Sequence, residues 1–338
     1  MTSRLLFIVL LVVCISTSSG CTANNQKAEE RQTMIHLNSM QDWCVGRYRF
    51  QLPKEAKIID ETMNYDTFKI ESKTKATRED FNNFIIDVEK KYNTKEDFIK
   101  DKTSVETQGN IVTKIIWGHS TFANGRLPVE VYAFVYDQSL RTLFKITGFY
   151  SKKNEDKSIN GIRYLVKNLK ARDNNNIPTE KGICLKNGFI KDNGKDYKFT
   201  KQRVGFNFAN APSVVITAET EAIYKAEDNL LVRTEKNLQK SPNYITTKNQ
   251  TKDLRKGEKT VNQSSPLSGL ELVIQVPMEK GTGIIATWEH AGTVNSALDP
   301  FVSMTVDTAR TENYVKSSSI PNNHGLQMYE TILNSLKK

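Results

Sequence analysis

Cysteine, proline and histidine are scarce in this sequence, and long hydrophobic runs are missing. The 338 residues include four cysteines, nine prolines and four histidines. Four cysteines are too few for a small scaffold held together by many disulfides. The apolar run from Leu5 to Ile15 has eleven residues, whereas a helix needs about 20 to cross a bilayer. The composition therefore excludes a polytopic membrane protein and a disulfide-rich miniature domain.

Charge is abundant and predominantly positive. The chain carries 48 Lys and Arg against 38 Asp and Glu, a formal net charge of +10, with 38% hydrophobic residues. Such a chain folds, and at about 100–200 residues per domain it is long enough for two cores. The lysines alternate with acidic residues and are not set among stacking aromatics, so a nucleic-acid partner is not expected. The charge favours an anionic membrane surface or an acidic protein.

The N-terminus has the organisation of an export signal. Arg4 precedes the apolar run, small and polar residues follow, and Cys21 comes directly after Gly20. We predict a signal peptide at 1–20 and a polar tether at 21–32. Ser-Gly before the cysteine resembles a lipobox, which predicts lipidation of Cys21 and an outer-membrane anchor in the periplasm. Ser18 stands where lipoboxes usually have an aliphatic residue, and ordinary cleavage that leaves a plain thiol is the alternative.

Export also bears on the remaining cysteines. Cys14 leaves with the signal peptide, and acylation of Cys21 leaves Cys44 and Cys184 in an oxidising compartment. Two thiols in such a compartment favour a disulfide. That bond would close a loop of about 140 residues and contribute up to roughly 4–5 kcal/mol. The alternative is two separate buried thiols.

Two halves of the chain show one order of elements: strands, a helix, three strands and a helix. A polar stretch that ends at Pro178 separates them and predicts a linker. We predict an N-terminal domain at 33–172, a linker at 173–182 and a C-terminal domain at 183–338. The fold class is α+β, with two tandem domains that each have a mainly antiparallel sheet and helices packed on one face.

Particular patterns support these elements. Residues 45–52 alternate as one strand before Pro53, and Thr77 to Asp80 form a capping box that opens a helix. The last helix repeats apolar residues on one face, namely Leu326, Tyr329, Ile332, Leu333 and Leu336. The stretch 239–268 is so polar that we expect a flexible loop or a binding segment there.

Catalytic and metal-binding motifs are missing from the sequence. It has no G-x-S-x-G, no H-E-x-x-H and no phosphate-binding loop. Its four histidines lie far apart without metal-ligand spacing; they are His36, His119, His290 and His324. Glu289 and His290 are neighbours in the sequence, but in a strand their side chains point to opposite faces. We therefore predict no catalytic residue, metal or cofactor, and no enzymatic activity.

Several stretches resemble a known family. They are Trp43 to Tyr48 with Leu52-Pro53 behind it, Ile177 to Cys184, Asn187-Gly188-Phe189, and Trp288 to Gly292. Their order, from about Thr33 to the C-terminus, is similar to that in type VI secretion immunity proteins cognate to the fourth class of antibacterial lipase effectors. Both openings lie where the domains are predicted to start.

The resemblance implies an inhibitor that binds a type VI phospholipase or lipase effector in the periplasm as a protein heterodimer. It further implies a clamp by two domains that blocks interfacial activation of the lipase. An envelope- or lipid-binding lipoprotein without a toxin partner is the alternative. The partner-binding residues are not identified by the sequence; Trp43, Trp117 and Trp288 are candidates, with burial in the core the stronger expectation.

Overall fold

The structure is a computed structural model of the chain. It describes residues 35–119, 129–240, 242, 244–310 and 315–338. The predicted signal peptide, the tether and Cys21 lie outside these residues. None of the described helices is both long and apolar enough to cross a membrane.

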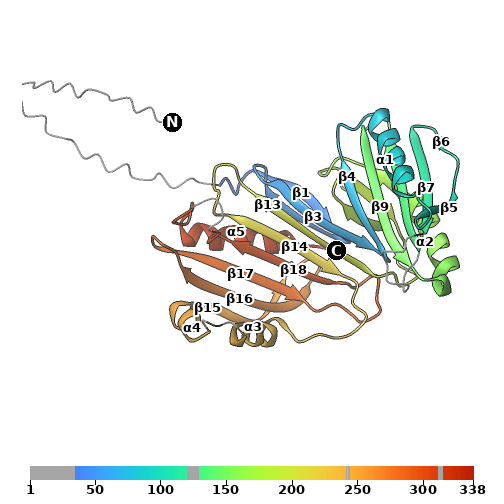
Figure 1. The fold of residues 1–338 in the computed structure, drawn as a ribbon. Helices are drawn as coiled ribbons and strands as arrows, with labels where there is room; N and C mark the ends of the chain where they lie inside the picture. Colours follow the sequence, from blue (N-terminus) through green and yellow to red (C-terminus); the bar gives the residue numbers. More distant parts are fainter. Residues whose placement is uncertain (1–34, 120–128, 241, 243, 311–314) are drawn as a thin grey trace, which may run out of the picture. The chain divides into compact units, whose positions relative to one another are not determined.

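A large, mainly antiparallel sheet runs through both halves of the chain (Figure 1). Its described strands follow the order β15-β16-β17-β18-β14-β13-β3-β4-β9-β8-β7-β5, with β6 paired to β7. In the first half the elements are β1 (Met40–Val45), β2 (Tyr48–Pro53), β3 (Lys57–Tyr65), β4 (Phe68–Lys73), α1 (Arg78–Lys91), β5 (Phe98–Lys102), β6 (Glu106–Gln108), β7 (Ile111–His119), β8 (Val129–Asp137), β9 (Thr142–Tyr150), η2 (Lys152–Asn154), α2 (Glu155–Asn168) and β10 (Leu169–Ala171).

The second half repeats this order with local differences. Its elements are β11 (Gly182–Leu185), β12 (Gly188–Lys191), β13 (Thr200–Asn207), β14 (Val215–Glu221), α3 (Leu230–Gln239), α4 (Tyr244–Gln250), β15 (Lys252–Val261), β16 (Leu267–Pro277), β17 (Thr282–His290), β18 (Phe301–Asp307) and α5 (Asn322–Ser335). The predicted class, α+β with mainly antiparallel strands, is confirmed.

Helices cover both faces of the sheet in the first half, whereas the sequence predicted helices on one face only. Strand β8 is buried along its whole length, so its alternate residues belong to two cores. Val131 and its neighbours on one face pack with Ile162 of α2, whereas Phe134 on the other packs with Phe81 of α1. The predicted capping box opens α1, since Thr77 and Asp80 each accept a hydrogen bond from the other's backbone N–H, at 3.1 and 2.8 Å.

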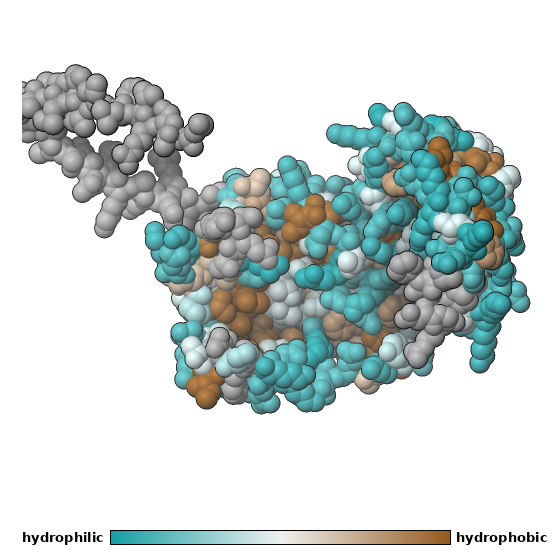
Figure 2. Space-filling view, viewed as in Figure 1, coloured by the Kyte–Doolittle hydropathy of each residue, from teal (hydrophilic) through white to brown (hydrophobic). Residues whose placement is uncertain are grey.

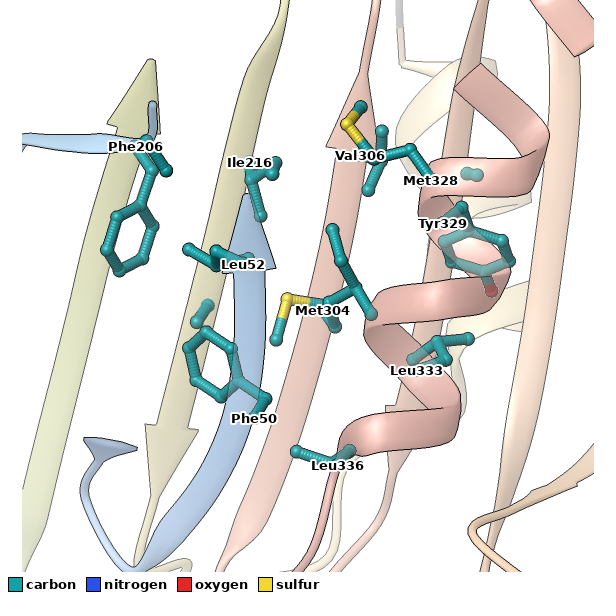
Figure 3. Packing of buried hydrophobic residues seen from close by; sticks show 14 of the residues in the cluster. Phe50, Leu52, Phe206, Ile216, Met304, Val306, Met328, Tyr329, Leu333 and Leu336 are labelled. Carbon is teal, nitrogen blue, oxygen red and sulfur yellow. The ribbon is translucent and has the colours of Figure 1, made fainter. Parts of the chain in front are cut away.

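One face of the sheet in the second half is covered by α5 (Figure 3). Tyr329, Ile332, Leu333 and Leu336 are fully buried there, as their spacing predicts, and Leu326 is half-buried. They pack on alternate residues of β17 and β18, such as Trp288 and Met304. A helix with one apolar stripe needs a sheet face of this kind to bury it.

The two halves exchange hairpins between their cores. The hairpin β1–β2 comes from the first half, but Trp43 and Phe50 pack on Phe206 in the core of the second half. In return, Ile183 and Ile190 of β11–β12 pack in the core of the first half. Residues 32–338 form one compact unit, and the predicted division at 173–182 stays a prediction.

Two further sequence predictions were wrong. Residues 45–52 are not one strand, because the chain turns at Gly46 and Arg47 to form the hairpin β1–β2, with Gly46 at a φ of +58°. The stretch 239–268 is not a loop, since it contains α4 and the ten-residue strand β15. Strand β15 lies at the edge of the sheet and is largely exposed, where charged residues prevent pairing with other chains.

Candidate binding face

The other face of the sheet in the second half is the candidate binding surface, and we call it the open face. Residues paired in an antiparallel sheet share a face. One row of paired residues across the strands therefore points away from α5. Ser303 in this row is buried, and the other members range from half-buried to exposed. The row consists of Glu258, Leu270, Glu289, Ser303, Glu219 and Arg203.

Apolar and uncharged side chains form the middle of this face. Leu272, Thr287, Thr305 and Thr217 occupy the next row, and the hydroxyl groups of Thr287 and Thr305 are 3.0 Å apart. Figure 2 shows hydrophobic areas on the surface in the region that β14, β17 and β18 occupy in Figure 1. A half-buried sheet face of this composition suits contact with another protein.

A cavity of about 870 Å³ lies between α3 and the strands of the open face. Half-buried Leu270 and Phe301 contribute apolar surface to its lining. Its lining residues include Lys201, Arg233 and Lys259, and six carboxylates outnumber these three, which leaves a formal charge of −3. Those carboxylates are Glu219, Glu221, Glu227, Asp228, Glu258 and Glu289. The ammonium group of Lys259 points to the face of the sheet that α5 covers, where it pairs with Glu330 of α5.

Ion pairs neutralise the inner part of the cavity. Arg233 of α3 donates to both carboxylate oxygens of Glu289, each at 2.6 Å. Lys201 lies 2.7 Å from Glu221 and 3.4 Å from Glu219. Burial raises the pKa of Glu289, and the charge of Glu219 adds to that rise, while Arg233 opposes it. The open face thus already binds one guanidinium and one ammonium group of its own chain.

A second cavity, of about 570 Å³, lies beside the disulfide. Cys44 and Cys184 are bonded, with their Cα atoms 5.7 Å apart, and so link the hairpin β1–β2 to β11. Gly46 and Cys184 also exchange two backbone hydrogen bonds, of 3.1 and 2.8 Å. The cross-link therefore lies where the exchanged hairpins meet.

Sequence reasoning missed a buried polar network at this junction. Asp192 accepts hydrogen bonds from Arg47 at 3.0 Å and from the hydroxyl group of Tyr65 at 2.7 Å. Burial and that carboxylate raise the pKa of Tyr65. Only the fold brings the three residues together, because they come from separate segments and no motif marks them.

The structure buries the three tryptophans that the sequence singled out and gives His290 two hydrogen-bond partners. Trp43, Trp117 and Trp288 are all buried in the core. His290 lies 2.8 Å from the backbone oxygen of Ser268 and 3.3 Å from Asp299. The side-chain hydroxyl group of Ser268 forms its hydrogen bond with Thr260 and not with His290. The described residues contain no group of three or more side chains suited to hold a metal ion.

Lipidation of Cys21 lies outside the described residues and stays a prediction.

Asp299 binds the last residue of the chain, Lys338. Burial opposes ionisation of the Asp299 carboxyl, but hydrogen bonds from Lys338 and Thr293 outweigh burial and hold its pKa at about 2. This arrangement joins the C-terminal residue to the rim of the second half.

Comparison with known proteins identifies the family. The model of the Tle cognate immunity protein 4 N-terminal domain matches residues 41–180, and that of the C-terminal domain matches residues 176–338. No curated protein matches the sequence.

Solved structures share the fold. The apo structure of the immunity protein TplEi of T6SS from Pseudomonas aeruginosa is 20% identical over 88% of this chain and 96% of that chain, with a TM-score of 0.69. The crystal structure of a Tle4–Tli4 complex contains a chain that is 20% identical over 89% of this chain and 98% of that chain, with a TM-score of 0.71. Because the two domain models together span residues 41–338, the chain belongs to the Tle cognate immunity protein 4 family.

Proposed function

We propose that this protein is an immunity protein that binds and inhibits a type VI secreted lipase effector. The observation that carries the proposal is the tandem match of both immunity-protein domain models across residues 41–338. A structural relative from a Tle4–Tli4 complex supports it, since that protein was solved together with a partner. The large half-buried open face gives this chain a surface for such a partner.

Inhibition then requires binding alone and no chemistry by this chain. A lipase that is activated at a membrane must open a lid, and a protein that binds the closed enzyme more tightly shifts the population towards it. A preference of about 10⁴-fold, or roughly 5.5 kcal/mol, moves such an equilibrium from one extreme to the other. Two halves of the chain that grip the lipase together would add avidity to that preference.

The place of action that we propose is the periplasm. A signal peptide at 1–20 would export the chain, and an acyl group on Cys21 would hold it at the outer membrane. The Cys44–Cys184 bond supports export, because disulfides persist in oxidising compartments. An anchored inhibitor would be concentrated next to the bilayer that the lipase attacks.

The test uses a type VI lipase effector, which we expect to be encoded beside this gene. The mature protein is mixed with that enzyme, and turnover of phospholipid vesicles is measured as the ratio of the two proteins rises. We expect a heterodimer by size exclusion and loss of turnover near one equivalent, with an unrelated phospholipase unaffected. Full lipase activity in excess inhibitor would refute the proposal. Flotation of the protein with anionic vesicles and no lipase binding would instead support the lipid-binding alternative.

A further inference from the structure

We propose that the cavity between α3 and the open face is the docking site for a basic segment of the partner protein, which inserts Lys or Arg side chains there. The nature of the partner as a lipase rests on the proposed function. The chemistry of the docking segment rests only on this chain.

The open face lacks the cover that other parts of the sheet have. In the described residues, α1 and α2 cover the two faces of the first half, and α5 with β1–β2 covers the inner face of the second. On the open face, α3 buries a single residue, Leu230. Half-buried Leu270 and Phe301 and the exposed Val294 therefore line a cavity that the chain itself leaves unfilled.

The charge of the cavity lining is opposite in sign to that of the whole chain. The whole chain has a formal charge of +10, whereas the cavity lining has −3. The net charge of the chain disfavours a basic segment, whereas the charge of the cavity lining favours one. Such a local reversal of sign orients a partner and selects against others.

Two carboxylates at the cavity remain available to a partner. Glu289 already holds a guanidinium group and Glu221 an ammonium group, which shows that the site accommodates both kinds of cation. Glu227 and Glu258 are exposed, and neither lies within ion-pair distance of a basic group in the part of the chain that the structure describes. The aliphatic stems of inserted Lys or Arg side chains would pack on the apolar lining.

The test is binding of a fluorescein-labelled octa-arginine peptide to the mature protein, measured by fluorescence anisotropy at low salt. The variant E227K/E258K reverses both available carboxylates and should bind at least about tenfold more weakly. The control E96K/E106K makes the same charge change at exposed sites in the first half, and its affinity should stay within about twofold of the wild type. No binding by the wild type, or equal weakening by both variants, would overturn the inference.

A second measurement separates this inference from the proposed function. The neighbouring lipase is titrated against the wild type and both variants. Weakened binding by E227K/E258K alone supports the docking site. Equal binding by all three proteins refutes the docking site and leaves the immunity role intact. If the peptide discriminates between the variants but no lipase binds the wild type, the proposed function fails and the cavity's preference for a basic segment stands.

Discussion

The exchange of hairpins predicts that the first half of the chain cannot fold when it is cut at the predicted linker. We compare two fragments, 54–172 and 54–192, both without the β1–β2 hairpin that belongs to the other core. The longer fragment keeps β11–β12 and carries Cys184→Ala, so that no unpaired thiol is left. The shorter fragment ends before that hairpin and exposes the core that it covers.

The size of the effect follows from three side chains. Ile183, Leu185 and Ile190 are 2%, 1% and 0% exposed in the core of the first half. Burial of each such side chain contributes about 1.5–3 kcal/mol, so the shorter fragment loses roughly 5–9 kcal/mol. The total stability of a domain is about 5–15 kcal/mol, so this loss removes most or all of it.

The assay is urea denaturation followed by tryptophan fluorescence, together with an amide proton spectrum of each fragment. We expect a cooperative transition and dispersed signals for 54–192, and neither for 54–172. A cooperative transition of 54–172 with the same midpoint as the longer fragment would refute the reasoning. It would mean that the core of the first half is complete without β11–β12.

Three further predictions concern the junction of the two halves. Replacing Cys44 and Cys184 by alanine should lower the free energy of unfolding by about 2–5 kcal/mol in urea, because the bond closes a loop of 140 residues; an unchanged midpoint would contradict this. Gly46→Ala should lower the Tm more than Gly109→Ala: both glycines have a positive φ, but a Cβ at Gly46 would lie 2.4 Å from a threonine methyl group and one at Gly109 meets nothing within 4 Å. Burial raises the pKa of Glu61 despite hydrogen bonds to its carboxylate, so the wild type should lose stability as pH rises from the ordinary pKa of 4.5 through the raised value. Glu61→Gln should therefore have a Tm advantage that grows from pH 4 to pH 8, and a constant difference would show that the carboxylate is not destabilised.

Much of the local structure could be predicted from the sequence. The capping box at Thr77 and the apolar stripe of α5 depend on neighbours within a few residues, and both form as their spacing predicts. Strand β15 escaped prediction because an exposed edge strand buries too little to need an alternating pattern. The turn at Gly46 was missed because the alternation continues through it.

The sequence by itself determined the α+β class, most of the helix positions and the family resemblance, since each depends on local order along the chain. With the predicted cleavage of the signal peptide and acylation of Cys21, it also singled out Cys44 and Cys184 as the pair expected to form a disulfide. Only the tertiary structure decided which core each hairpin joins and which carboxylates meet beneath α3. Those contacts join segments far apart in the chain, and they depend on the fit between whole surfaces, which no short pattern of residues encodes.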